Sequence, residues 1–158
     1  MRKSIRVLGM VVLAAVMSVA GGYAVSGVHA QDAAVPQPAL EPAMKTGQMM
    51  EAFFEGVHES LSAEMKAEPQ TPKGWKTIKS SASAFAELSN LVMIHKEYDD
   101  MKTWYEMATV MKTTALDLAK AADEKNFAQA TEKYKALVES CNACHKKFEP
   151  ETGPVIEL

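Results

Sequence analysis

Arginine is nearly absent from this sequence, and cysteine occurs only twice. Both arginines lie within the first six residues, and the two cysteines, Cys141 and Cys144, lie three positions apart near the C-terminus. The alternation of apolar and polar residues that marks a half-buried strand is also lacking. These absences argue against a sheet-based fold and against an arginine-rich surface that binds nucleic acid, and two cysteines allow at most one disulfide.

The first 30 residues have the layout of a secretory signal. A basic start at positions 2–6 precedes a largely apolar run, Val7–Ala20, and small residues end the segment at 28–30. We therefore predict a signal peptide over residues 1–30, cleaved after Ala30, and an exported chain in the periplasm. The alternative is an uncleaved N-terminal anchor, because roughly 20 apolar residues can span a bilayer.

The chain that remains after cleavage is mildly acidic. Removal of 30 residues from 158 leaves 128, in which 14 lysines stand against 20 acidic residues, a net charge of −6. Such a surface argues against nucleic acid and against an anionic membrane as the main partner. A chain of this length is expected to form one domain around one core.

Four stretches after a proline-containing lead-in, residues 31–41, repeat apolar residues every three or four positions. We expect a helix over each stretch. The first runs from Pro42 to Lys66, and the second begins at Thr71-Pro72 and ends between His95 and Tyr98. The third begins at Asp99 or Asp100, and the fourth runs from near Asn126 through Phe148. Helices of roughly 20 residues joined by short loops favour an all-α fold, an antiparallel up-down-up-down four-helix bundle. The bundle is expected over residues 42–150, followed by a C-terminal tail over 151–158.

The two cysteines belong to the pattern Cys-x-x-Cys-His, which is formed by Cys141, Cys144 and His145. This pattern is the attachment signature of a c-type haem. Two thiols must reach one edge of a porphyrin while an imidazole reaches the iron from the same side. On a helix the i,i+3 and i,i+4 spacings point all three side chains one way. We expect one covalent haem c per chain, with its iron bound by His145.

Three other uses of a close cysteine pair stay open. A redox-active dithiol needs a low-pKa thiolate at a helix N-terminus, whereas this pair lies near the C-terminus of an all-helical chain. A zinc site needs four ligands, and His58 and His95 lie far from the pair in sequence. A structural disulfide, which export would favour, would leave a haem-free helical module.

The predicted export, the four helices and the single Cys-x-x-Cys-His motif near the end of the last helix resemble the class II c-type cytochromes, the cytochrome c′ group. The resemblance covers Met44 to Glu149, although the motif is its only specific element. It implies a haem within the bundle, held at the last helix, with its distal side facing the first helix. Members commonly carry an arginine shortly after the motif histidine, where this chain has KKFE at 146–149.

The sixth ligand of the iron decides which function this resemblance implies. The first helix offers Met44, Met49 and Met50, and Met50 is in phase with the apolar stripe that continues through Phe54, Val57 and Leu61. We expect Met50 to face the core and bind the iron, whereas Met49 lies one residue off the stripe. In the alternative, Met50 merely packs and a vacant distal face binds a small gas such as NO or CO.

Several other residues have competing interpretations. His58 is a further candidate ligand from the first helix, but its polar neighbours predict a surface position. Trp75 and Trp104 lie on apolar stripes and are expected in the core. Tyr134 and Phe148 share the stripe of the cysteines and are expected to contact the porphyrin.

The sequence as a whole predicts a monohaem c-type cytochrome that carries single electrons and is not an enzyme. Its expected partner is a periplasmic or membrane-bound redox protein, or a small gas in the alternative, and the sequence leaves a homodimer open. Lys146 and Lys147 either form a positive rim that steers an acidic partner or remain solvated and offset the helix dipole.

Overall fold

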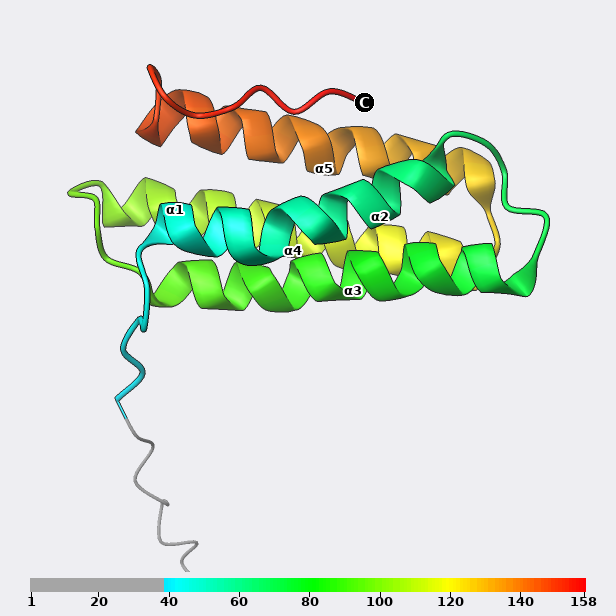
Figure 1. Cartoon of the computed structure of the whole chain (residues 1–158), viewed down its shortest axis with the longest axis horizontal. Coiled ribbons are helices and arrows are strands. Elements are labelled where there is room, and N and C mark those ends of the chain that lie inside the picture. Colours follow the sequence, from blue (N-terminus) through cyan, green and yellow to red (C-terminus); the bar gives the residue numbers. More distant parts are fainter. Residues whose placement is uncertain (1–38) are drawn as a thin grey trace, which may run out of the picture. The chain divides into compact units, whose positions relative to one another are not determined.

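The computed structural model describes residues 39–158, which form helices and no strands. Its elements are α1 (Thr46–Met49), the π-helical η1 (Met50–Phe54), α2 (Glu55–Met65), α3 (Pro72–Ile94), α4 (Met101–Asp123) and α5 (Phe127–Phe148). The elements α1, η1 and α2 follow one another without a break, and the long helices lie alongside each other (Figure 1). The predicted all-α class is therefore confirmed. The predicted signal segment 1–30 and positions 31–38 of the lead-in lie outside the described residues.

Side-chain caps begin the last three helices where the sequence places them. The Thr71 hydroxyl accepts from the Gly74 amide at 3.3 Å, and Pro72 occupies the first turn of α3. Asp100 and Asn126 cap α4 and α5 in the same way. Each cap satisfies an amide that has no partner within its own helix, so the starts of α3, α4 and α5 are predictable from local chemistry.

The first helix differs from its prediction in two respects. It begins at Thr46 rather than near Pro42. At this start, the carboxylate of Glu97 accepts a hydrogen bond from the Thr46 amide at 3.1 Å. Its buried face also steps five residues, from Met49 to Phe54, across the π-helical turn. The predicted stripe of Met50, Phe54, Val57 and Leu61 still packs against the core, and the π turn adds Met49 to it, because a π turn holds more residues than an α turn.

The core follows the order of the helices along the chain. The closely packed pairs are α2 with α3, α3 with α4, and α4 with α5. The side formed by α3 and α4 is the most closely packed and is rich in alanine. Helix α4 alone buries Ala108, Ala115, Ala119, Ala121 and Ala122. Trp75 and Trp104 are both buried, as predicted, and the Trp104 indole donates to the Val92 carbonyl at 2.9 Å.

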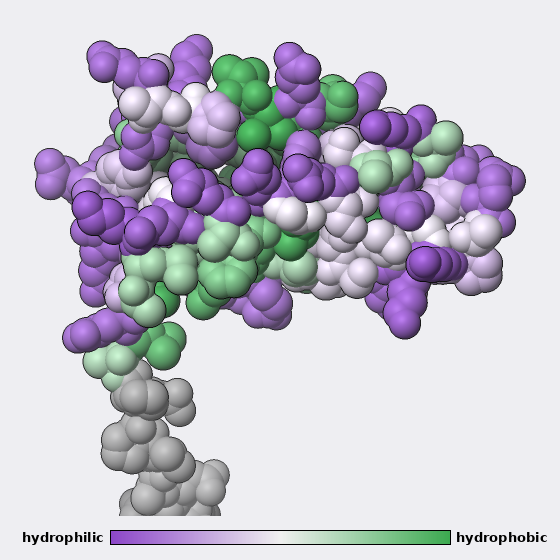
Figure 2. Space-filling model, in the orientation of Figure 1, coloured by the Kyte–Doolittle hydropathy of each residue, from purple (hydrophilic) through white to green (hydrophobic). Residues whose placement is uncertain are grey.

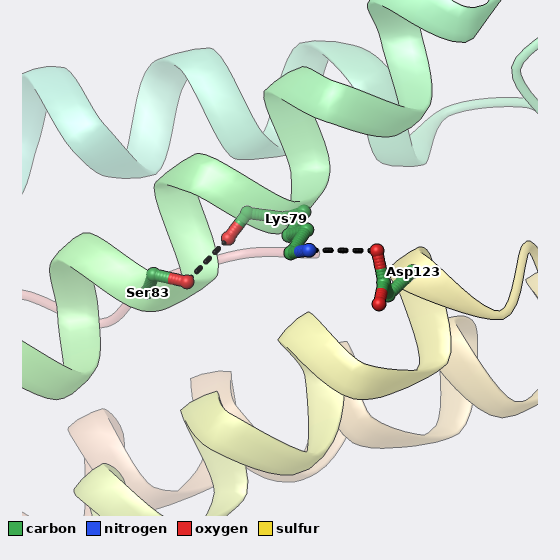
Figure 3. Close-up of polar contacts among 3 residues, drawn as sticks. All are labelled: Lys79, Ser83 and Asp123. Atoms are coloured by element: carbon green, nitrogen blue, oxygen red, sulfur yellow. Dashed lines mark hydrogen bonds and ion pairs between the residues drawn. The ribbon is translucent and has the colours of Figure 1, made fainter.

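An exposed ion pair joins α3 to α4 on the surface of this alanine-rich side. Lys79 Nζ lies 2.6 Å from Asp123 Oδ1, while the Ser83 hydroxyl donates to the Lys79 carbonyl at 2.9 Å (Figure 3). Both charged side chains are largely solvated. The pair is therefore expected to add little to stability compared with the buried alanine contacts.

The chain turns back after α5 and runs beside that helix (Figure 1). Backbone groups of Ile156 are bonded to the side chain of Asn142 on α5, and Ile156 packs against the core. Hydrophobic residues gather on the surface in the same region (Figure 2). The predicted tail over 151–158 is therefore a packed part of the unit formed by Pro38–Leu158.

None of the helices within residues 39–158 is long and apolar enough to cross a membrane.

Candidate functional site

The residues that the sequence selects meet at one place. Because α5 continues unbroken to Phe148, Cys141, Cys144 and His145 keep their i,i+3 and i,i+4 spacing. All three line a small cavity of about 30 Å³, and Met50 of η1 lines the same cavity. That volume accommodates about one water molecule. Two segments more than ninety positions apart in sequence thus contribute to one site.

A larger cavity adjoins the small one and lies between η1–α2 and α5. Its volume is about 420 Å³, and it shares Met50, Cys141 and His145 with the small cavity. Its remaining walls come from η1, α2, α3 and the C-terminal segment, with Glu51, Phe54, Glu55, His58, Glu59, Phe85, Pro154 and Ile156. Ligand pockets in proteins commonly have volumes of roughly 300–1,000 Å³. The larger cavity is therefore of a size to hold part or all of a bound organic group.

The two thiols are free and half-buried. Burial raises the pKa of Cys141 to about 11, with a smaller contribution from Cys144. Burial also raises the pKa of the Cys144 thiol to about 11. Both groups therefore remain neutral near pH 7, which is the opposite of the stabilised thiolate that a dithiol redox site requires.

A hydrogen bond from the imidazole of His145 fixes its tautomer. Nδ1 lies 2.7 Å from the carbonyl oxygen of Pro154. Because a carbonyl can only accept, Nδ1 carries the proton, and in the neutral ring Nε2 keeps its lone pair. His145 is thus prepared to bind a metal through Nε2.

Met49 is more deeply buried than the sequence predicts, whereas Met50 faces the core as expected. Met49 is only 2% exposed and belongs to the closed core, so the expectation that it lies off the buried stripe is wrong. Met50 is half-buried and packs against the core. Its side chain forms part of the wall of both cavities. The π-helical turn that begins at Met50 causes the burial of Met49, since it rotates the residues before it relative to α2.

His58 is partly buried and lies in the wall of the larger cavity, a boundary position rather than the fully solvated one that its polar neighbours favour. Its Nε2 lies 3.3 Å from the hydroxyl of Tyr134, and the two rings stack at 6.3 Å with an interplanar angle of 19°. Burial lowers the pKa of His58 below its ordinary value of 6.5, and Glu59 opposes that shift.

The aromatic residues on the cysteine stripe do not line either cavity. Tyr134 is buried behind His58. Phe148 packs with Tyr98 at 4.8 Å and with Trp104 at 5.0 Å, and these three rings form a cluster at the end of α5. The expected contact between these two side chains and a bound ring gains no support from this arrangement.

The charges around the cavities give no support to a positive rim formed by the two lysines of the last turn. Lys147 is paired with Asp100, whose carboxylate lies 3.3 Å from Lys147 Nζ. The larger cavity is instead bordered by the exposed carboxylates of Glu51, Glu55 and Glu59. Its rim is therefore acidic.

Within the described part of the chain, no group of three or more His, Cys, Asp or Glu side chains is arranged to hold a metal ion by itself. The zinc-bound alternative for the cysteine pair therefore gains no support from these residues.

No model of a known protein family matches the chain, and no curated protein matches its sequence.

Proposed function

We propose that this protein is an exported monohaem c-type cytochrome that carries single electrons, with a haem c held by Cys141, Cys144 and His145. The observation that carries the proposal is the convergence of these three residues and Met50 on two adjoining cavities. The proposal includes the class II, cytochrome c′-like type, a periplasmic location and no enzymatic activity. When bound, the iron of such a group supplies a one-electron redox centre.

The residues present fit such a group. The two thiols are free, so neither is committed to a disulfide and each can be consumed as a thioether. The imidazole of His145 has its Nδ1 occupied by Pro154 and its Nε2 available. The larger cavity offers apolar walls from Phe54, Phe85 and Ile156. Cysteine would hold the porphyrin, histidine would bind the iron, and these apolar side chains would exclude water.

The arrangement of the helices supports the finer fold assignment. Each helix packs against the next along the chain, and the connections between them are short. These features favour the antiparallel up-down-up-down bundle. In that topology the first and last helices are neighbours, and the larger cavity lies between them.

We assign the sixth iron ligand to Met50. It is the one methionine of the first helix that lines both cavities, and it stands at the start of a π turn. Such turns are frequent at functional sites. In the alternative, Met50 only packs and the vacant position on the iron would bind a small gas, so the two functions differ in the role of a single side chain.

The acidic rim bears on the redox partner. Glu51, Glu55 and Glu59 are exposed around the cavity, and their charges attract a basic surface. We therefore favour a periplasmic or membrane-bound redox protein with a lysine- or arginine-rich docking face over the acidic partner suggested by Lys146 and Lys147.

Intact-mass analysis tests the proposal. The full chain is exported from a bacterial host with haem-attachment machinery, beside a Cys141→Ser/Cys144→Ser double variant and an Ala143→Ser control. The unaltered protein and the control should carry the added mass of one haem, whereas the double variant should carry none. An unmodified mass in the unaltered protein refutes the proposal and supports the haem-free alternative.

Absorption spectra of the same protein test the ligand assignment. Ligation by Met50 predicts low-spin iron in the unaltered protein and high-spin iron in Met50→Ala. Met44→Ala, at a position 37% exposed, is the control and should keep the low-spin spectrum. A high-spin spectrum in the unaltered protein supports the gas-binding alternative instead.

A further inference from the structure

The segment after α5 is folded tightly against the histidine of the motif. The carbonyl of Glu149 accepts from the amides of Thr152 at 3.3 Å and Gly153 at 2.7 Å, which turns the chain back toward α5. Gly153 then passes close to His145, and a Cβ at this glycine would lie 2.9 Å from His145 Cβ and 2.8 Å from the Glu149 carbonyl oxygen. The close approach therefore requires a residue without a side chain.

A second anchor fixes the same segment one turn earlier on α5. The Asn142 side chain donates to the Ile156 carbonyl at 2.9 Å and accepts from the Ile156 amide at 2.7 Å. One side chain thus satisfies both backbone groups of one residue. The Ile156 side chain packs against the core and forms part of the wall of the larger cavity.

Pro154 lies between these two anchors. Its carbonyl is the acceptor for the Nδ1 proton of His145, at 2.7 Å. A hydrogen bond of this kind fixes the ring orientation and the tautomer of a metal-binding histidine, and it makes the opposite nitrogen a stronger donor to the metal. Asn142 and Gly153 do not touch the His145 ring nitrogens, but together they hold the carbonyl that does.

We propose that Asn142, Gly153 and Pro154 form a positioning device that orients the His145 imidazole toward the iron and strengthens its donation. This inference rests on the proposed function, because the device matters only if His145 binds the iron. It assigns a role to the C-terminal segment and to Asn142, one of the two variable positions between the motif cysteines. Since stronger donation favours the ferric state, the intact device lowers the reduction potential of the iron.

The test uses two variants that loosen the device at different points. Gly153→Ala pushes the segment away from His145, and Asn142→Ala removes both hydrogen bonds to Ile156. Gly47→Ala is the control for the glycine change, because a Cβ at Gly47 meets no atom within 4 Å. All variants are exported as full chains, and their haem content is checked by intact mass.

Two measurements are made on each variant. Hydrogen exchange of the Ile156 amide, followed by NMR, should be slow in the unaltered protein and in Gly47→Ala, and at least tenfold faster in the other two variants. This measurement reports on the segment itself and does not depend on the iron. The midpoint potential of the haem-loaded protein should rise in Gly153→Ala and in Asn142→Ala and remain unchanged in Gly47→Ala.

Each outcome decides the inference. A higher potential together with faster exchange supports the positioning role. Faster exchange with an unchanged or lowered potential overturns it, since the segment would then only shield the site or stabilise the fold. Unchanged exchange in both variants overturns the anchoring geometry. Unaltered protein without haem refutes the proposed function and this inference together, whereas haem-loaded protein with an unresponsive potential leaves the proposed function standing.

Discussion

The two sides of the bundle are built from different residues. The α3–α4 side is closed by small and aliphatic side chains in regular α-helices, with Ala82, Ala115 and Leu118 fully buried. The side between η1–α2 and α5 contains a π turn, the larger cavity, and the titratable residues His58 and His145, and the small cavity extends from it to residues of α3 and α4. Regular helix geometry and small residues allow close helix approach, whereas the irregular turn keeps the first helix from closing on the last.

This difference separates the part of the molecule that stabilises the fold from the part that is available for binding. The closed side fixes the positions of α3 and α4, and α5 packs against α4. The motif residues stand on the side of α5 that faces the larger cavity. The closely packed α3–α4 side supplies buried surface that stabilises the fold, and the larger cavity lies outside it.

The largest change in the free energy of unfolding is expected when a buried leucine on the closed α3–α4 side is truncated to alanine. Leu118 on α4 and Leu61 on α2 are both 0% exposed, so Leu118→Ala and Leu61→Ala remove the same chemistry at the same burial. Leucine-to-alanine changes in cores cost about 2–5 kcal/mol, and the cost grows with the cavity that remains. We expect Leu118→Ala near the upper end of this range and Leu61→Ala near the lower end, because α2 can relax toward the open side.

Urea denaturation of the full chain measures this difference. Leu116→Ala, at an α4 position 49% exposed, is the control and should change the free energy of unfolding by about 0.5 kcal/mol or less. An equal loss at Leu61 and Leu118 would mean that the two sides are packed to the same degree, which contradicts the comparison.

The closed side was also the more predictable one. The caps at Thr71, Asp100 and Asn126 are local signals, and the stripes of α3, α4 and α5 follow a regular helical period. Because α5 is regular, the i,i+3 and i,i+4 spacing of the cysteine motif correctly predicts that its three residues share one helix face. Local hydrogen bonding and periodicity therefore sufficed for these elements.

The open side depends on features without a local signal. A π turn changes the phase of a helix, and nothing in the stretch MEAFF marks it, so the sequence does not predict the burial of Met49. His58 acquires its place from Tyr134, which is 76 positions away. The return of the C-terminal segment depends on Asn142, whose partner is Ile156. Contacts between distant segments decide these positions, and no periodicity within one helix reports them.

A smaller effect is expected from acid on the open side. Burial holds the pKa of His58 below 6.5, so the unfolded chain binds a proton more readily than the folded chain. Stability therefore falls as the pH is lowered from 7 through 6.5 toward the folded pKa. In His58→Gln, which keeps a polar side chain but does not titrate, the decline between pH 7 and pH 5.5 should be shallower.

Titration of the His58 ring protons by NMR measures the shift directly. Because Glu59 raises the pKa of His58, Glu59→Gln should lower it further and steepen the loss of stability in the same range. The carboxylates of Glu149 and Asp100 have lowered pKa values and lose their contributions only at more acidic pH. A pKa of His58 at or above 6.5 would contradict its placement in the cavity wall.

The smallest effect is expected for the ion pair on the closed side. Lys79→Met keeps the aliphatic stem and removes the charge, while the Ser83 hydroxyl still donates to the backbone carbonyl of residue 79. A double-mutant cycle with Asp123→Asn should give a coupling of about 0.5 kcal/mol, typical of exposed pairs, and salt should reduce it further. A short distance of 2.6 Å does not change this expectation, because both side chains are largely solvated and must lose rotamer freedom to meet. A coupling well above about 1 kcal/mol would mean that surface charge, and not the buried alanine contacts, holds α3 against α4.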